Sequence, residues 1–468
     1  MRSAIPRLVC AARGLATLAP STTTQISSAS AVTGPFGGRD GGTVVGSVAE
    51  GWEDLRVAFE QNFAENLELG AQLTVYQNGL RVVDLHGVAH NAPRYGAHTL
   101  QNIFSSGKNL EAIACMLLVD RGLLKYEDTI AAHWPAFGQH GKAHVTVEDV
   151  LRHESGLQFF VDPAHPNDFK KNFTPSVADV EATASGAVER VIERAGLWGY
   201  GQRMYHASTR GFILGGLVRQ MTGRTLGAFI KSEIAEPLGI DVLCGTPLDV
   251  QRRYEYAPMQ SVGLGYTLRR EVLPALVGLG GNPETFATLK WLGDALTTKG
   301  HPLGGYPKTI PKEWEQGGGD KHHVNTPEGR TLEVSSGAIQ ANARSLATLS
   351  ALLANGGEVG GVRLASEATV RLSMSEPRVR RDDCWRMTVA NTKGGFFDFG
   401  TFTELVGADN AMAATAQRGF LGWGGKGGSL FLFDPQRNLG FAYVMNGMML
   451  GGAGGPRTAR LFDVLRQK

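Results

Sequence analysis

Four consecutive residues, Ser105-Ser106-Gly107-Lys108, place a hydroxyl and an amine three positions apart at the start of an apolar run. On a helix, side chains three residues apart lie on one face, so the Lys108 amine can stand beside the Ser105 hydroxyl. A serine needs an adjacent base to act as a nucleophile. The first turn of a helix adds unpaired N–H groups and partial positive charge for an oxyanion. The pattern predicts nucleophilic catalysis, although S-x-x-K also occurs by chance as a helix cap followed by a surface lysine.

The elements around this stretch predict a hairpin and two helices. An apolar stripe indicates a helix over residues 52–67, and the helix that contains Lys108 is expected to end near residue 124. Between them, the strands 73–76 and 80–85 flank an Asn-Gly pair, which is the strongest two-residue hairpin signal. The Ser105 helix is therefore expected to follow directly after a sheet.

The middle of the chain, from about residue 126 to 334, has the pattern of helices and loops. Helices are expected over residues 177–195, 208–222, 226–234 and 284–298. Strands return at 429–433 and 440–445 around a turn sequence, and a last helix is expected to begin at Pro456.

Antiparallel strands from both chain ends can share one sheet, with the helical middle as an insertion. The prediction is therefore an α+β fold with one catalytic domain over residues 47–468. Its sheet region comprises about 47–125 and 335–468.

The first 38 residues contain three arginines and no acidic residue, and serine and threonine are frequent in residues 21–33. A basic, hydroxyl-rich and acid-poor segment is typical of a transit peptide. Residues 34–46 are rich in glycine and are interpreted as a linker. We therefore expect residues 1–46 to be a targeting segment and linker, and a mitochondrial location. The alternative is an N-terminal tail that carries no targeting signal, on a cytoplasmic protein.

Composition excludes several classes of function. A formal net charge of +2 and the lack of a long basic tract argue against a nucleic-acid partner. No uninterrupted apolar span is long enough to cross a membrane. The four cysteines are far apart and form no C-x-x-C pair, so reduced thiols are expected, with Cys115 in the core. No motif for a metal, a phosphate loop or a dinucleotide is present, and no cofactor is expected.

Two later stretches join Ser105 and Lys108 in a recognisable order. They are Tyr205-His206-Ala207 and the glycine-rich sequence that begins Trp423-Gly424-Gly425-Lys426. This order resembles the serine β-lactamases and penicillin-binding proteins. It is most similar to the class C-like group, which includes family VIII carboxylesterases and mitochondrial serine β-lactamase-like proteins. The resemblance covers residues from about 51 to 464 and implies a β-lactamase/transpeptidase-like fold.

The resemblance implies a role for each matching residue. Ser105 would be the acylated nucleophile, with Lys108 and Tyr205 as its catalytic partners. Tyr205 would accept the serine proton and later protonate the leaving group, or Lys108 would be the base. These two assignments stay open. The backbone N–H groups of Ser105 and Lys426 would form the oxyanion hole.

Two departures from the β-lactamase pattern concern the substrate. Trp423 occupies a position where β-lactamases usually carry the lysine of Lys-Thr-Gly, and it offers an apolar wall and one N–H donor. Ala207 replaces the asparagine that contacts the amide of β-lactams. The first change favours neutral esters, and the second favours a substrate other than a β-lactam. We expect Trp423, Gly424, Gly425 and His206 to bind substrate, with the glycines allowing close approach to the strand edge.

Other candidates for the site have simpler interpretations. Tyr76 matches the family's Y-x-N spelling, but it precedes Ser105 and is interpreted as a sheet tyrosine. Tyr200, Tyr254 and Tyr256 are expected to be packing residues. His153, in an Arg-His-Glu-Ser-Gly-Leu stretch, is expected to brace a loop.

The sequence as a whole predicts a metal-free serine hydrolase acting on a small ester or amide, with a carboxylesterase as the first choice. The alternatives are a peptidase, an amidase or a β-lactamase. From a different class, Trp423 and Ala207 also fit a β-lactamase fold that has become an inactive scaffold or binding protein. Neither the natural substrate nor the oligomeric state follows from the sequence.

Overall fold

The computed structural model describes residues 25–33, 41–90, 92–261, 323–385, 387–399, 419–448 and 456–468. The helix expected over residues 284–298 lies outside these ranges.

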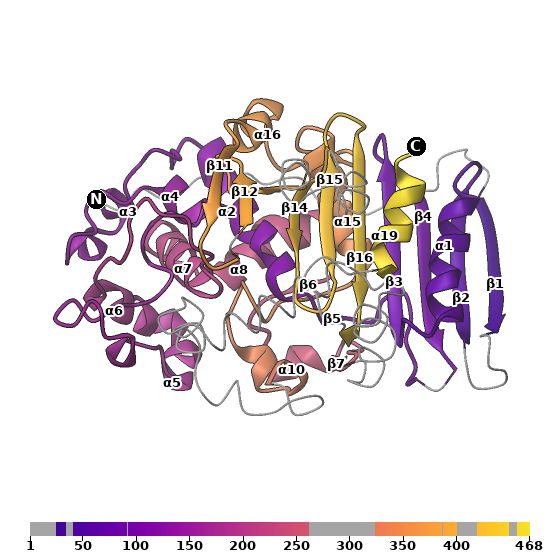
Figure 1. Ribbon diagram of the computed structural model, residues 1–468, viewed down its shortest axis with the longest axis horizontal. Coiled ribbons are helices and arrows are strands. Elements are labelled where there is room, and N and C mark those ends of the chain that lie inside the picture. The colour runs from indigo at the N-terminus through magenta and orange to yellow at the C-terminus, as the bar shows by residue number, and fades with distance from the viewer. Residues whose placement is uncertain are drawn as a thin grey trace, which may run out of the picture.

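A ten-stranded antiparallel sheet runs from the centre of the molecule to one end, with the order β1-β2-β4-β3-β16-β15-β14-β13-β12-β11 (Figure 1). Its strands are β1 Gln25–Thr33, β2 Gly41–Ala49, β3 Gly70–Gln77, β4 Leu80–Ala89, β11 Arg378–Asp382, β12 Met387–Asn391, β13 Phe397–Asp398, β14 Leu421–Gly424, β15 Leu430–Asp434 and β16 Leu439–Met445. The two chain ends meet where β3 pairs with β16, with Leu73 opposite Tyr443. This confirms the predicted α+β fold with one sheet built from both ends.

The predicted hairpin joins β3 to β4. Asn78 and Gly79 have φ angles of 51° and 75°, the left-handed conformation that a two-residue type I′ turn requires. The turn holds Leu73 opposite Leu85 and Val75 opposite Val83.

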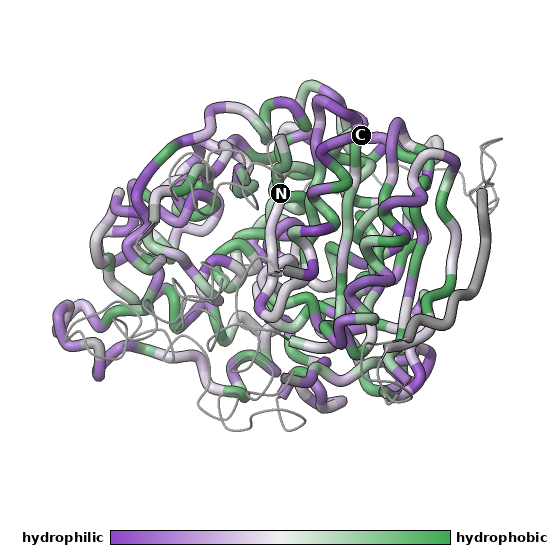
Figure 2. The backbone as a smooth tube through the Cα atoms, turned by 45° about the vertical axis from the view of Figure 1, so that its right-hand side comes forward, coloured by the Kyte–Doolittle hydropathy of each residue, from purple (hydrophilic) through white to green (hydrophobic). Residues whose placement is uncertain are grey.

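Helices cover both faces of this sheet. On one face, α15 Ala343–Ala354 and α2 Lys108–Asp120 pack against Phe431, Phe433 and Val444. On the other, α1 Glu53–Ala64 and α19 Pro456–Leu465 pack against Leu432, Phe441 and neighbouring strand residues. The buried residues alternate between the two faces along each strand, as the period of two requires. Figure 2 shows hydrophobic residues recurring along the strands and the helices packed on them.

The glycine-rich segment interpreted as a linker is partly sheet, which corrects the prediction for residues 41–46. These residues begin β2, which pairs with β1 on one side and β4 on the other. Glycine is needed here for close pairing, because a Cβ on Gly42 would meet the Val88 carbonyl oxygen at 2.5 Å. Val44 and Val48 fill the core beneath them.

Two of the four helices predicted for the middle region are present. They are α7 Thr209–Thr222 and α8 Leu226–Ile230, which continues into a π-helical turn, Lys231–Ala235. The helix expected over 177–195 is wrong as one piece. It forms α5 Val177–Glu181, a 3-10 turn and α6 Ala187–Arg194, because Gly186 adopts a left-handed φ of 75°.

Within the described ranges, no helix combines the length and apolar character needed to span a bilayer. The described cysteines, Cys115, Cys244 and Cys384, are buried free thiols. Cys115 lies in the main core, as predicted.

Candidate active site

Ser105 lies in a 3-10 turn, η1 Phe104–Gly107, that leads directly into α2 at Lys108. The residue before it, Phe104, has a φ of 45°, which is unfavourable for a bulky side chain. The Asn102 Oδ1 atom accepts a hydrogen bond from Phe104 N at 2.8 Å and supports this conformation. Local strain of this kind concentrates at functional sites.

Hydrogen bonds fasten η1 to the edge of β14 and the start of β15. The Ser429 hydroxyl donates to the Ile103 carbonyl at 2.9 Å, and the Ser106 hydroxyl donates to Ser429 O at 3.1 Å. A Cβ on Gly425 would meet Ile103 O at 2.2 Å. Glycine is therefore needed at this position for the close contact between the segment after β14 and the residue before η1.

The structure brings Ser105 and Tyr205 together across 100 residues of sequence. The Ser105 Oγ and Tyr205 Oη atoms are 2.6 Å apart, which is a short O–H···O hydrogen bond. Ser105 is partly exposed, whereas the Tyr205 side chain is almost buried. A phenol at this distance can exchange a proton directly with the serine.

Lys108 lies beneath this pair. Its Nζ atom is 4.8 Å from the centre of the Tyr205 ring and donates to Ala207 O at 2.6 Å. The side chain is fully buried, and burial is the main reason that its pKa falls from 10.5 to about 7. Arg210 lowers the pKa further, while Glu111 opposes the shift. A fraction of neutral amine is therefore available near neutral pH.

Arg210 and Glu111 form an ion pair at 3.2 Å with both side chains fully buried. The Ser335 and Ser336 hydroxyls donate to Glu111 Oε1 at 2.8 and 2.6 Å. Arg210 also donates to the Lys108 carbonyl oxygen at 3.2 Å. This pair fixes the first turn of α2, and the Arg210 guanidinium interacts electrostatically with Tyr205.

The two amides expected to form the oxyanion hole belong to segments held against each other. Ser105 lies in η1 and Lys426 in the turn after β14, whose neighbour Gly425 packs on Ile103. Among the described residues, neither Ser105 N nor Lys426 N has a hydrogen-bond acceptor. The Lys426 side chain is exposed, with its Nζ atom 5.9 Å from the centre of the Phe104 ring.

Trp423 differs from its expected role. Its ring is 2% exposed, and its Nε1–H donates to the Gly395 carbonyl at 2.8 Å. The N–H donor that the sequence offered to substrate is therefore already used. The ring packs edge-on against His153, with centroids 5.3 Å apart. Gly424, on the same strand, is partly exposed.

The prediction that His206 lines the binding site is corrected. Its side chain is fully buried, and both ring nitrogens have partners: Nδ1 lies 2.6 Å from Met204 O and Nε2 lies 2.7 Å from the Ser155 hydroxyl. Burial lowers its pKa to about 3, so the ring is neutral. His206 holds its loop together and cannot reach substrate.

Trp385 is an aromatic residue of the site that sequence reasoning missed. Its partly exposed ring lies 4.6 Å from that of Tyr205, at an interplanar angle of 34°. The Asp382 carboxylate accepts from Cys384 N at 2.9 Å and Trp385 N at 3.0 Å, and it also bonds the Tyr205 backbone. Desolvation raises the Asp382 pKa to about 6. The signal for Trp385 in the sequence was its position shortly after Asp382, an aspartate that can begin a turn.

The competing tyrosines lie outside the site. Tyr76 is a buried β3 residue whose hydroxyl is 3.4 Å from Thr348 Oγ1, as expected for a sheet tyrosine. Tyr200 was expected to pack but is 42% exposed, and its hydroxyl donates to Asp149 at 3.0 Å.

No group of three or more potential metal ligands among His, Cys, Asp and Glu occurs in the described part of the chain.

Residues 59–465 match the Beta-lactamase family. The chain belongs to this family. The esterase/beta-lactamase LipL of Mycobacterium tuberculosis is 29% identical over 401 residues, which are 84% of this chain and 80% of LipL.

Solved structures of this family share the fold. A penicillin-binding protein homologue from Caulobacter crescentus has a TM-score of 0.67 and 28% identity, covering 91% of this chain and 99% of its own. A family VIII carboxylesterase has a TM-score of 0.66 and 26% identity, with the same coverage of each chain. The protein is therefore a serine hydrolase with a β-lactamase/transpeptidase-like fold, as the sequence predicted.

Proposed function

We propose that this beta-lactamase-family hydrolase is a carboxylesterase that cleaves small neutral esters through an acyl-enzyme on Ser105. The observation that carries the proposal is the 2.6 Å hydrogen bond between Ser105 Oγ and Tyr205 Oη, beside a buried lysine whose pKa is about 7. This arrangement supplies a nucleophile, a proton acceptor and an amine that changes its charge near neutral pH, all within one site.

In the proposed mechanism, Tyr205 enters as the phenolate, and Ser105 Oγ attacks the ester carbonyl while its proton passes to the Tyr205 oxygen. The carbonyl oxygen becomes an oxyanion that accepts hydrogen bonds from Ser105 N and Lys426 N. The C–O bond then breaks, and Tyr205 returns the proton to the departing alcohol. Water attacks the acyl-enzyme by the same route in reverse, which restores Ser105 and releases the acid. Lys108 modulates the proton affinity of Tyr205.

Residues around the nucleophile favour an ester over a β-lactam. Ala207 offers no side-chain amide, and the lysine of the β-lactamase triad is replaced by a tryptophan whose N–H is bonded to Gly395. The partly exposed ring of Trp385 adds apolar surface beside Tyr205. The names esterase/beta-lactamase and family VIII carboxylesterase among the similar proteins support the same choice.

Turnover of short p-nitrophenyl esters by the full-length protein tests this proposal. We expect Ser105→Ala to abolish turnover and Tyr205→Phe to reduce it by at least ~100-fold, within the range of a lost acid–base catalyst. Tyr76→Phe is the matched control, because it removes a phenol hydroxyl far from Ser105 and should leave turnover unchanged. A folded protein that turns over no ester would favour a scaffold. Equal turnover by Ser105→Ala would exclude this nucleophile.

A further inference from the structure

We propose that His153 is the positioning residue for Tyr205: its backbone carbonyl and its Nδ1 atom bind the chain on both sides of the tyrosine and aim the phenol at Ser105. This inference rests on the proposed function of Tyr205. His153 then contributes to catalysis through Tyr205, in addition to bracing its loop as the sequence predicted.

Two hydrogen bonds connect His153 to the tyrosine segment. Met204 N donates to the His153 carbonyl at 3.0 Å, and His206 N donates to His153 Nδ1 at 3.0 Å. The two donors belong to the residues immediately before and after Tyr205. Hydrogen bonds to His153 thus hold the residues on both sides of Tyr205. The tyrosine ring also contacts the imidazole, with centroids 5.1 Å apart.

The backbone conformation of His153 makes this double contact possible. Its φ is 63°, in the left-handed region that non-glycine residues seldom adopt. There the carbonyl and the side chain of one residue both face the tyrosine segment. Asparagine tolerates this conformation far better than most residues and carries an oxygen acceptor near the position of Nδ1. Glycine tolerates it but has no acceptor.

The contact also requires a neutral imidazole, because a protonated ring has no acceptor nitrogen. His153 is 1% exposed, and burial is the main cause that holds its pKa well below 6.5. The charges of Arg210 and Lys108 add to this effect. With Nδ1 accepting, the proton lies on Nε2, which has no hydrogen-bond partner among the described groups. The ring is therefore kept as an acceptor.

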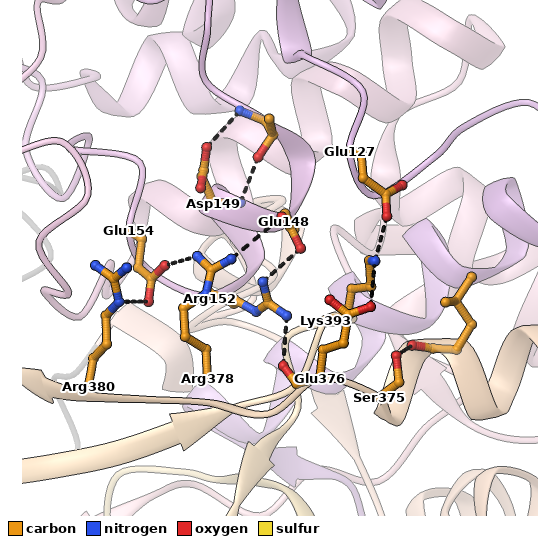
Figure 3. A network of polar contacts seen from close by, with 12 residues as sticks. Glu127, Glu148, Asp149, Arg152, Glu154, Ser375, Glu376, Arg378, Arg380 and Lys393 are labelled. Carbon is orange, nitrogen blue, oxygen red and sulfur yellow. Dashed lines mark hydrogen bonds and ion pairs between the residues drawn. The ribbon is translucent and has the colours of Figure 1, made fainter.

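A network of ion pairs fixes the neighbouring residue, Glu154 (Figure 3). Its buried carboxylate accepts from Arg203 Nη2 at 2.6 Å, pairs with Arg378, and lies 3.5 Å from Arg380 Nε. Arg378 and Arg380 belong to β11, and Arg203 lies two residues before Tyr205. Glu154 thus locks the His153 loop, the tyrosine segment and the sheet edge together.

The same network continues to the far side of the loop. Arg152 pairs with Glu148 at 2.7 Å and donates to Glu376 O at 2.8 Å, and Lys393 pairs with Glu376 at 2.9 Å (Figure 3). The residues before and after His153 are therefore both held by ion pairs, which keeps its left-handed backbone in place.

Three variants separate positioning from folding. His153→Asn keeps the conformation and a side-chain acceptor, whereas His153→Gly keeps the conformation and the backbone carbonyl but loses the side-chain acceptor of His206 N. His140→Gly is the matched control, since His140 also has a left-handed φ of 53° but is exposed and remote from the site. We expect His153→Gly to lower kcat for a p-nitrophenyl ester by ~100-fold, the effect of a misplaced catalytic group, with KM nearly unchanged. His153→Asn should stay within severalfold of the parent, and His140→Gly should equal it.

Amide hydrogen exchange tests the same contacts without catalysis. We expect the Met204 and His206 amides to be protected in the parent and in His153→Asn. In His153→Gly, protection of the His206 amide should be lost while that of α2 persists. Fast exchange at His206 in the parent would overturn the proposal, even if the glycine variant does not fold. A folded His153→Gly with normal kcat, or an inactive but folded His153→Asn, would also overturn it. Absence of ester turnover in the parent would count against the proposed function and leave the exchange result to decide the role of His153.

Discussion

Lys108 illustrates what spacing in the sequence predicts about a single residue. The S-x-x-K pattern placed its amine near Ser105, and the structure puts it beneath the Ser105–Tyr205 pair. Its hydrogen bond, however, goes to Ala207 O, which lies 99 residues away in the chain. The same limit applies to Trp423 Nε1 and His206 Nε2, whose partners Gly395 and Ser155 lie 28 and 51 residues away in the chain.

Burial of the Lys108 amine predicts a pH-dependent cost to stability. The pKa of this amine is about 7 in the folded state, whereas the ordinary value for lysine is 10.5. Below pH 7 the amine is charged in both states, and the folded state bears the full cost of burying it. The cost declines as pH rises from about 7 to 10.5, because the folded amine is already neutral.

Lys108→Met should therefore stabilise the protein more at pH 6 than at pH 9, by about 3 kcal/mol from the shift of pKa. Urea unfolding at the two pH values measures the difference, with exposed Lys125→Met as the control. A gain that is equal at both pH values, or larger at pH 9, would contradict the account.

At the scale of elements, periodic patterns predicted the helices and strands well, and glycines were the main source of error. The Asn78-Gly79 hairpin and the β15–β16 pair are present as expected. Glycines that suggested a linker instead permit close strand pairing at Gly42, and a left-handed Gly186 interrupts a helix. A glycine required by a tertiary contact has the same local signature as one in a flexible segment.

Gly425 offers a test of the contact between η1 and β14. A Cβ here would meet Ile103 O at 2.2 Å and Ser429 Oγ at 2.3 Å. Gly425→Ala should push η1 away from the strand, destabilise the protein by about 1–3 kcal/mol as overpacking does, and lower ester turnover by more than ~10-fold through displacement of Ser105.

Gly215→Ala in α7 is the control, because its Cβ would meet nothing nearer than Leu226 at 3.7 Å. Helix propensity predicts that it is neutral or stabilising by up to about 1 kcal/mol. Thermal unfolding and turnover should be measured on both variants. Wild-type stability and activity in Gly425→Ala would show that η1 is not held as described.

At the scale of the whole molecule, the sheet is closed by contacts between distant ends of the chain. Arg457 in α19 pairs with buried Glu68 at 3.1 Å and donates to Gly447 O at 2.7 Å and Gly427 O at 2.5 Å. Gly427 follows Lys426, so the last helix supports the turn that contains the proposed oxyanion-hole amide. Strand patterns at both chain ends predicted one shared sheet, but no local pattern could predict which charges pair across 389 residues.

Arg457→Met should destabilise the protein by roughly 3–5 kcal/mol, because it leaves the Glu68 carboxylate buried without its partner. Adding Glu68→Gln should recover part of this loss, since the uncompensated charge is then removed. Urea unfolding of both single variants and the double variant measures the coupling. Strictly additive losses would contradict a direct role for the pair.

The most direct test of the central claim is to trap the acyl group on the enzyme. The full-length protein is mixed with p-nitrophenyl acetate, quenched in acid within the first turnover, and analysed by intact mass and peptide mapping. We predict one acetyl group per chain, on the peptide that contains Ser105, and no adduct in Ser105→Ala. Turnover without an adduct, or an adduct on another residue that persists in Ser105→Ala, would contradict the assignment of Ser105 as the nucleophile.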